Sequence, residues 1–329
     1  MSAPLRLDGA RVLVTGGAGF IGSNFVHRLL AQHPTAHVVV LDALTYAGRR
    51  ENLDGIPADR LTFVHGDIRD PEAVARAMAG CAFVLNFAAE SHVDRSIETP
   101  GEFIQTDVYG VFVLAEEARR VGVQRFIQVS TDEVYGEVLE GHSTEEWPLN
   151  PRSPYAASKA GGDRLAYAYW CTYGLPVVVT RCSNNYGPRQ FPEKVIPLFV
   201  TNLMDGLNVP LYGDGLNVRD WLHVDDHCRG ILAVLDRGRA GEVYNIGGGT
   251  ELTNRELTTR LLALCGADES RVTPVADRLG HDRRYCVDWG KIHRELGYSP
   301  QVDFAEGLAA TVAWYQENES WWRPLKAAQ

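Results

Sequence analysis

The sequence of 329 residues predicts an α/β fold, with a doubly wound parallel sheet and a smaller, mixed α/β part toward the C-terminal end. Three observations predict it. Short apolar runs, suited to strands buried on both faces, alternate with segments of helical spacing. The first run leads straight into a glycine-rich turn. The regular alternation breaks down beyond Arg181.

The amino-acid composition and net charge of the chain exclude several classes of function. Hydrophobic residues make up 45% and charged residues 22% of the chain, as in an ordinary globular protein. The formal net charge of −10 argues against nucleic-acid or anionic-membrane partners. No stretch approaches about 18 uncharged apolar residues, so we expect no membrane span. The six scattered cysteines show no metal-ligand spacing, which predicts reduced thiols, no metal site and a cytoplasmic location.

The first element is the segment Arg11–Asn24. Val12–Val14 reads as a buried strand, and helical spacing takes over near Gly19. Gly17, Gly19 and Gly22 satisfy the pattern G-x-G-x-x-G, which brings backbone N–H groups and a helix N-terminus against a pyrophosphate. The alternative is an ordinary strand–helix turn that binds no ligand.

The second strand, His37–Leu41, ends in an acid. Asp42 lies 20 residues after Gly22, where a carboxylate would bind the hydroxyl groups of the adenosine ribose. A carboxylate there repels a 2′-phosphate. The sequence therefore predicts NAD as cofactor, and not NADP.

The third and fourth strands also deliver polar or small residues to the carboxyl edge of the sheet, where ligands bind. Leu61–His65 is followed by Asp67, which we expect at the adenine, although a loop-capping role is the alternative. Asp70 and Pro71 then open a helix. Phe83–Phe87 is followed by two alanines that leave room for a cofactor, and then by polar residues within reach of a substrate. A plain polar loop is the alternative for that stretch.

The fifth strand, Arg125–Val129, leads to the polar run Ser130–Glu133, whose acid pair could also be an exposed helix-capping turn. The helix that begins near Pro154 carries Tyr155 and Lys159 on one face, because they are four residues apart. A nearby ammonium group and a positive nicotinamide ring would lower the pKa of a tyrosine and let it act as a base.

The sixth strand, Pro176–Arg181, ends the first domain. We expect residues 1–183, with a returning segment at about 218–246, to bind the cofactor. Residues 184–217 and 247–329 are expected to form the second, substrate-binding domain.

Within these later segments, Val218–Val224 reads as a strand that returns to the main domain, with Asp225 capping the helix after it. Glu242–Ile246 reads as a further short strand. Thr253 with Glu256 three residues later matches a capping box.

Several motifs together resemble the extended short-chain dehydrogenase/reductase family, over nearly the entire chain. They are VTGGAGFIGSN, LDALTYAG, HGDIRD, FAAESHVDRSI, VSTDEVYG, SPYAASKAG, RCSNNYGP, PEKVIPLF, LYGDGLNVRDWLHVDDHCRG, YNIGGG and DRLGHDRRY. The resemblance implies a Rossmann-type NAD-binding domain. Within the family the motifs are similar to those of the nucleotide-sugar 4,6-dehydratases, because the pair Asp132-Glu133 stands where epimerases typically carry small residues.

The resemblance implies a reaction on dTDP-glucose. Tyr155 would take the proton from the sugar O4 while the C4 hydride moves to NAD, and the hydride would later return to C6. Glu133 would be the base at C5 and Asp132 the acid at O6. Thr131 would hydrogen-bond O4, where many relatives use a serine, and Lys159 would support Tyr155.

The resemblance also assigns binding residues. Those expected at the cofactor are Gly16, Gly19, Phe20, Ile21, Gly22, Asp42, Leu44, Thr45, Asp67, Ile68, Phe87, Ala88, Ala89, Ser91, Thr106, Tyr155, Lys159 and Asn185. Those expected at the nucleotide sugar are Ser91, Thr131, Asp132, Glu133, Asn184, Lys194, Arg219, Asn254, Asp277, Arg278, His281 and Tyr285. Arg219 would face the diphosphate, since its planar fork suits phosphate oxygens.

Relatives are commonly homodimers that pair two helices from each subunit, which here would be Phe103–Val121 and Pro154–Thr172. The apolar contacts would come from Val111, Phe112, Ala115, Tyr167 and Trp170, some of which could equally pack on the sheet.

Two alternative functions remain open. A nucleotide-sugar 4-epimerase or a UDP-glucuronate decarboxylase would use the same cofactor and Tyr155 but would leave the acid pair without a role. A non-catalytic NAD-sensing module is an alternative of another class. The presence of both Tyr155 and Lys159 weighs against it.

Overall fold

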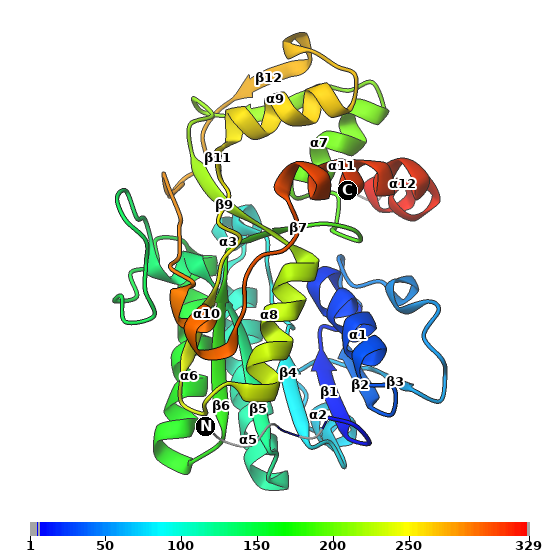
Figure 1. Cartoon of the computed structure of the whole chain (residues 1–329), viewed down its shortest axis with the longest axis vertical. Helices are drawn as coiled ribbons and strands as arrows, with labels where there is room; N and C mark the ends of the chain where they lie inside the picture. The colour runs from blue at the N-terminus through cyan, green and yellow to red at the C-terminus, as the bar shows by residue number, and fades with distance from the viewer. Residues whose placement is uncertain (1–4, 6, 328–329) are drawn as a thin grey trace.

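The computed structural model describes residue 5 and residues 7–327, and its largest sheet has seven parallel strands (Figure 1). The strand order is β10-β6-β5-β4-β1-β2-β3, which confirms the predicted doubly wound fold. The strands are β1 (Arg11–Thr15), β2 (His37–Asp42), β3 (Leu61–His65), β4 (Phe83–Asn86), β5 (Arg125–Thr131), β6 (Val177–Cys182) and β10 (Val243–Ile246). The chain reverses direction across the sheet between β1 and β4, where such sheets bind ligands.

Helices cover both faces of this sheet. One face carries α1 (Phe20–Gln32), α8 (Val224–Arg237) and α10 (Gly290–Leu296). The other face carries α2 (Pro71–Met78), α5 (Val111–Val121) and α6 (Pro154–Tyr173).

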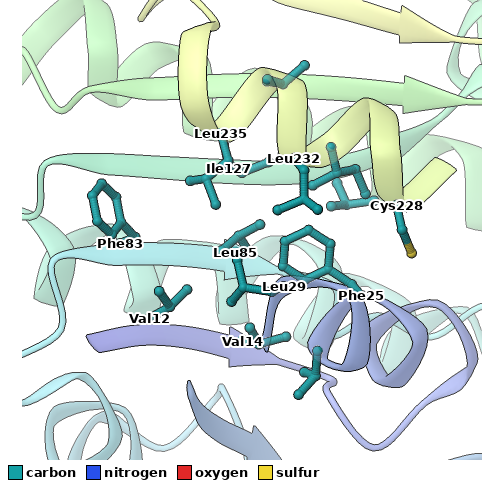
Figure 2. Packing of buried hydrophobic residues seen from close by; sticks show 14 of the residues in the cluster. Val12, Val14, Phe25, Leu29, Phe83, Leu85, Ile127, Cys228, Leu232 and Leu235 are labelled. Carbon is teal, nitrogen blue, oxygen red and sulfur yellow. The ribbon is translucent and has the colours of Figure 1, made fainter. Parts of the chain in front are cut away.

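Successive side chains of each strand point to opposite faces of the sheet, so each strand contributes residues to both hydrophobic cores. Val12 and Val14 of β1 point to the α1–α8 face, whereas Leu13 between them points to the α2–α5 face. Figure 2 shows Phe25 of α1 and Leu232 of α8 packed over the strands on the first face. The continuous apolar runs of the sequence therefore serve two cores at once.

Predicted helix starts are confirmed in two cases. Asp70 accepts a hydrogen bond from the N–H of Glu72 at the start of α2, and Pro71 takes the first position. Thr253 and Glu256 form the reciprocal capping box of α9 (Asn254–Leu264). Asp225 does not cap α8. The His223 side chain accepts the N–H of Asp225, because the helix already begins at Val224.

The segment predicted as helical, Phe103–Val121, is helical throughout, but six of its residues form a π-helical turn. Two short helices, α3 (Val93–Glu98) and α4 (Pro100–Ile104), lead to a π-helical turn over Gln105–Gly110, and α5 follows. The π-helical turn brings its backbone against α6, since a Cβ on Gly162 would overlap the carbonyl of Asp107.

The smaller part lies beyond the carboxyl ends of the main strands, at the top of Figure 1. It contains a three-stranded sheet of β7 (Asn184–Tyr186), β9 (Val218–His223) and β11 (Glu251–Thr253), and a parallel pair of β8 (Val209–Tyr212) and β12 (Val272–Val275). The helices α7 (Val195–Met204), α9, α11 (Phe304–Glu317) and α12 (Glu319–Ala327) share a separate core with these strands.

The segment Val218–Val224, expected as a strand that returns to the main domain, forms β9 (Val218–His223) outside the main sheet. The strand β9 pairs with β7 and β11 instead. Its buried Asp220 accepts the backbone N–H groups of Gly248 and Thr250 and the hydroxyl of Ser183, which ties the strand to the smaller sheet. The chain returns to the main sheet only with α8 and β10.

Two residues expected at a dimer interface lie in the core. Val111 and Ala115 are fully buried against the sheet, because they are on the inner face of α5. Phe112, on the other face, is 40% exposed. Among the described residues, no helix is both long and apolar enough to cross a membrane.

Candidate active site

A cavity of about 330 Å³ opens at the carboxyl ends of β1, β2, β4 and β5. A second cavity of about 380 Å³ adjoins it and extends between the main sheet and the smaller part. The two share a wall made of Ser91, Glu133, Asn184, Asn185, Gln190, Glu193 and Lys194. One continuous space can therefore hold a cofactor at one end and a substrate at the other.

The glycine-rich turn lines the first cavity. Gly16 has a φ of +65°, and a Cβ there would lie 2.7 Å from the backbone nitrogen of Ala88. A Cβ on Gly22 would overlap the carbonyl of Gly16, so glycine is required where α1 packs against the turn. Gly19 precedes α1, and no side chain of the described residues caps this helix. Its first N–H groups are free to bind an anion, which fits a dinucleotide.

Asp42 holds this turn from the end of β2. Its Oδ2 accepts the N–H of Ala18 and its Oδ1 the N–H of Leu44, both at 2.8 Å. Burial raises the pKa of Asp42. The carboxylate thus has a structural task besides lining the cavity. Each of its oxygens keeps a second lone pair for a ribose hydroxyl.

The expected cofactor residues come together in this cavity, with one exception. Its lining includes Gly16, Gly19, Phe20, Ile21, Gly22, Asp42, Thr45, Asp67, Ile68, Phe87, Ala88, Ala89, Ser91, Thr106, Tyr155, Lys159 and Asn185. Leu44 is not part of the lining. It has a positive φ of 49° and packs against the core of the α1–α8 face.

Two of these side chains are engaged by other residues. Asp67 forms an ion pair with Arg69, with Oδ2 and Nη2 2.7 Å apart. Asn185 donates to the carbonyl of Ser183 and shares a hydrogen bond with buried His227. They therefore shape the cavity wall as well as facing it.

Helix α6 brings Tyr155 and Lys159 to the cavity. The ammonium group of Lys159 donates to the carbonyl of Val129 on β5 at 2.9 Å. Burial raises the pKa of Tyr155 well above its ordinary value, and the charges of Glu133 and Asp107 add to the rise. The chain's own groups therefore do not produce the lowered pKa expected from the sequence. The lowered pKa expected from the sequence also requires the positive charge of a nicotinamide ring.

The acid pair follows β5 on a short 3₁₀ turn, Asp132–Tyr135. The hydroxyl of Thr131 donates to Asp132 Oδ1 at 3.2 Å and accepts the N–H of Glu133 at 3.3 Å. Asp132 is only 3% exposed, and its Oδ2 has no partner among the described residues. An exposed acidic turn is thus excluded, because the pair lines the cavity beside Tyr155.

The two acids have different surroundings. Burial raises the pKa of Asp132 well above its ordinary value, and the charges of Glu133 and Asp220 add to this. Burial also raises the pKa of Glu133, but the charges of Arg219, Lys194 and Arg278 oppose that rise. A protonated Asp132 beside an ionised Glu133 is the arrangement that these surroundings favour.

The expected nucleotide-sugar residues line one or other of the two cavities, again with one exception, and most of them line the second. The second includes Ser91, Glu133, Asn184, Lys194, Arg219, Asn254, Arg278, His281 and Tyr285, while Thr131 and Asp132 line the first. Asp277 is exposed and outside the lining. Its Oδ1 lies 2.7 Å from Nδ1 of His281, so it orients that ring.

The cations of this cavity are held in place. Arg219 lies over the ring of Tyr285, 4.4 Å from its centroid, and donates to the carbonyls of Val218 and Asp282. Arg278 binds the carboxylate of Asp94 through Nε and Nη2.

Sequence reasoning missed several lining residues. Asp94, Ser153, Tyr212, Trp221 and Asp282 line the second cavity, and all five lie within motifs quoted above that did not single them out. His92 and Glu193 also lie within quoted motifs. Membership of a motif was the sequence signal that could have identified all of these residues.

A possible metal cluster lies away from these cavities. Ligand atoms of His142, Glu251 and Cys286 lie within 4.8 Å of one another. Glu251 already forms two hydrogen bonds with Arg284, and burial raises the pKa of the Cys286 thiol. This environment disfavours a bound cation.

Comparison with known proteins identifies the family. The model of the GDP-mannose 4,6 dehydratase family matches residues 13–311. The dTDP-glucose 4,6-dehydratase of Streptomyces antibioticus is 59% identical over 320 residues, covering 96% of this chain and 95% of that protein. The chain belongs to the dTDP-glucose 4,6-dehydratase family.

A solved member of the dTDP-glucose 4,6-dehydratase family, from Streptomyces venezuelae with NAD and TYD bound, superposes with a TM-score of 0.94. It is 62% identical, and the match covers 96% of this chain and 99% of that one. A UDP-glucose 4-epimerase from Thermus thermophilus, solved with NAD, has a TM-score of 0.87 at 37% identity over 94% of this chain and 99% of its own. Dehydratase and epimerase thus share the fold, and the sequence is much more similar to the dehydratase.

Proposed function

We propose that this protein is an NAD-dependent dTDP-glucose 4,6-dehydratase, a hydro-lyase that forms dTDP-4-keto-6-deoxy-glucose. One observation carries the proposal. Asp132 lies buried and Glu133 half-buried beside Tyr155, in a cavity whose other end is the glycine-rich turn. A dehydratase needs an acid and a base next to its oxidising centre. An epimerase or a decarboxylase of this fold would have no use for them.

Oxidation at C4 comes first. Tyr155 accepts the proton of the sugar O4, and the Thr131 hydroxyl hydrogen-bonds the same oxygen. NAD, when held by the glycine-rich turn and Asp42, supplies the hydride acceptor at C4 and the hydride donor at C6. The hydrogen bond from Lys159 to the carbonyl of Val129 fixes the position of Tyr155 relative to β5.

Elimination of water follows from the new 4-ketone, which acidifies the C5–H. Glu133 removes this proton, because three cations favour its ionised form. Asp132 protonates the departing 6-hydroxyl, since burial beside another acid keeps it protonated. The two neighbouring acids thereby act in opposite senses on one substrate.

The second cavity is the site we propose for the nucleotide. Arg219 and Lys194 supply positive charge for the diphosphate, and Asn254 and Tyr285 line the same space. Accordingly, we assign cofactor binding to residues 1–183 with α8 and β10 of the returning segment, and nucleotide-sugar binding to residues 184–223 and 247–329. Since β9 pairs within the smaller part, its Arg219 also belongs to the nucleotide side.

We also propose a cytoplasmic homodimer. Tyr109 and Phe112, next to each other on the surface of the π-helical turn and α5, are 43% and 40% exposed, and their ring centroids are 5.8 Å apart. An aromatic pair of this kind on the expected helix pair suits a subunit contact. The six cysteines are all free thiols, which supports a reducing compartment.

The experiment that tests the function is a product analysis with dTDP-glucose. We expect a product lighter by one water, no net NADH, and one deuteron at C5 when the reaction runs in deuterated water. A product of unchanged mass with inverted C4 would indicate an epimerase and contradict the proposal. UDP-glucose assayed in parallel would measure the preference for the base.

A further inference from the structure

Two segments far apart in the sequence form two walls of the first cavity and contact each other. The loop after β2 contributes Ala43, Thr45, Ala47 and Gly48, and the segment before α7 contributes Gln190, Phe191, Glu193 and Lys194. Tyr46 joins the two walls from outside the lining. Its hydroxyl donates to Glu193 Oε1 at 2.9 Å, and its ring meets that of Phe191 edge to face at 5.3 Å.

A third segment adds to this contact. Arg95 of α3 places its guanidinium over the ring of Tyr46, 3.7 Å from the centroid. Its Nη2 lies 3.8 Å from Glu193 Oε2, and the Nε2 of His92 lies at the same distance from that oxygen. The carboxylate of Glu193 is only 8% exposed, although Arg95 is 44% exposed.

The Glu193 carboxylate is costly to bury unless it is paired. Burial raises its pKa, and the charges of Lys194 and Arg95 and the hydroxyl of Tyr46 oppose the rise. The hydrogen bond from Tyr46 is charge-assisted, and such bonds are stronger than those between neutral groups. This small cluster therefore favours the state in which the two walls are joined.

We propose that Tyr46, Glu193 and Arg95 form a clasp that closes the cofactor cavity and retains the dinucleotide. The three segments that it joins come from both parts of the fold, and all three border the cavities. For the cofactor to exchange with solvent, the Tyr46–Glu193 bond must open.

The proposal of a clasp rests on the proposed function, because that reaction requires the enzyme to retain its cofactor. The hydride taken from C4 has to be returned to C6 of the same sugar. Loss of the reduced cofactor between these steps would leave a 4-keto sugar and no reductant. A slow-opening cavity prevents this loss.

The test measures cofactor exchange directly, without sugar. The holoenzyme is loaded with radiolabelled NAD and diluted into excess unlabelled NAD, and the label that stays with the protein is followed over time. Tyr46→Phe keeps the ring against Arg95 and Phe191 but removes the bond to Glu193. We expect it to lose label about tenfold faster, equivalent to about 1.4 kcal/mol.

Arg95→Met keeps the side-chain length and removes the cation over the ring, and we expect an increase of about threefold. The matched control is Tyr173→Phe. Tyr173 also lies under an arginine, with Arg119 4.9 Å from its ring centroid, but it is 55% exposed at the end of α6. It should exchange at the wild-type rate. Thermal unfolding of each variant verifies folding, and Arg95→Met carries the test alone if Tyr46→Phe does not fold.

Wild-type rates of cofactor exchange in both clasp variants would contradict the proposed clasp without bearing on the proposed dehydratase function. Failure to dehydrate dTDP-glucose, with retention that still depends on Tyr46, would overturn the function alone. A chain that does not retain NAD at all would overturn both.

Discussion

Lys159 of α6 donates a 2.9 Å hydrogen bond to the backbone carbonyl of Val129 on β5. Val129 lies two residues before Thr131, and Tyr155 lies one helical turn before Lys159. This contact therefore helps to fix α6, which carries Tyr155, relative to the acid pair. The same ammonium group is also the positive charge nearest in sequence to Tyr155 on that helix face.

Lys159→Met tests that contact. We expect kcat to fall by about 100-fold or more, because the phenolate of Tyr155 loses a supporting charge. The free energy of unfolding should also fall by about 1–3 kcal/mol, since the Val129 carbonyl stays buried without a donor. Steady-state dehydration assays and thermal unfolding measure the two effects. Unchanged kcat would contradict the role of Lys159.

A buried ion pair holds the same helix one turn further along. Asp163 accepts two hydrogen bonds from Arg181 of β6, at 2.8 and 3.0 Å, and both residues are almost fully buried. Asp163→Asn leaves the guanidinium without its counter-charge, so we expect about 3–5 kcal/mol of destabilisation in chemical denaturation. Arg164→Gln is the control, because Arg164 is exposed on the same helix and should cost little. A small effect of Asp163→Asn would show that the pair does not anchor α6.

Asp107, in the π-helical turn, should influence how kcat depends on pH. Its carboxylate accepts the hydroxyl of Ser158 at 2.7 Å and the N–H of Glu90 at 3.1 Å. Burial raises the pKa of Asp107 to about 6, against the opposing charge of Lys159, so it is negative above that pH. In that form it raises the pKa of Tyr155.

Asp107→Asn removes the negative charge, which lowers the pKa of Tyr155 and leaves more of it as the active base at a given pH. The acidic limb of the kcat–pH profile should move to lower pH. A profile that moves to higher pH, or does not move, would exclude electrostatic coupling between these residues.

The raised pKa of Asp132 has a consequence for stability. Because the folded protein binds this proton more tightly than the unfolded chain, the contribution is fully present below the unfolded pKa and is lost as pH rises through the folded pKa. Asp132→Asn does not titrate. We therefore expect it to be more stable than the wild type by about 0.5–2 kcal/mol at neutral and alkaline pH, with loss of activity.

Melting curves over a pH series measure this difference, and it should shrink as the pH falls toward the ordinary pKa of a carboxyl group. Equal stability of Asp132→Asn and the wild type at alkaline pH would mean that the ionised Asp132 does not destabilise the folded protein.

The main sheet could be predicted because its signals are local. The glycine-rich turn, the apolar runs and the four-residue spacing of Tyr155 and Lys159 each lie within one segment. The partner of β9 could not be predicted, because strand periodicity does not say which sheet a strand joins. Its position depends on Asp220, whose partners lie 28 and 30 residues away in the chain.

The site could be predicted only in part, for the same reason. The residues of quoted motifs converge on two cavities, but the pairing of Asp163 with Arg181 joins positions on different elements. The rise in the pKa of Tyr155 comes mainly from burial, which depends on packing from several elements. Leu44 and Asp277 lie beside cavity residues in sequence and yet outside the linings. Leu44 has a positive φ and packs on the core, and Asp277 pairs with His281.

In the proposed reaction, Glu133 removes the C5 proton after Tyr155 has started oxidation at C4. The most direct measurement is the absorbance of NADH on mixing Glu133→Gln holoenzyme with dTDP-glucose. The variant should oxidise the sugar and then stall, so that about one NADH per active site accumulates and the release of water falls by about 100-fold or more. Normal turnover without NADH accumulation would contradict this role of Glu133.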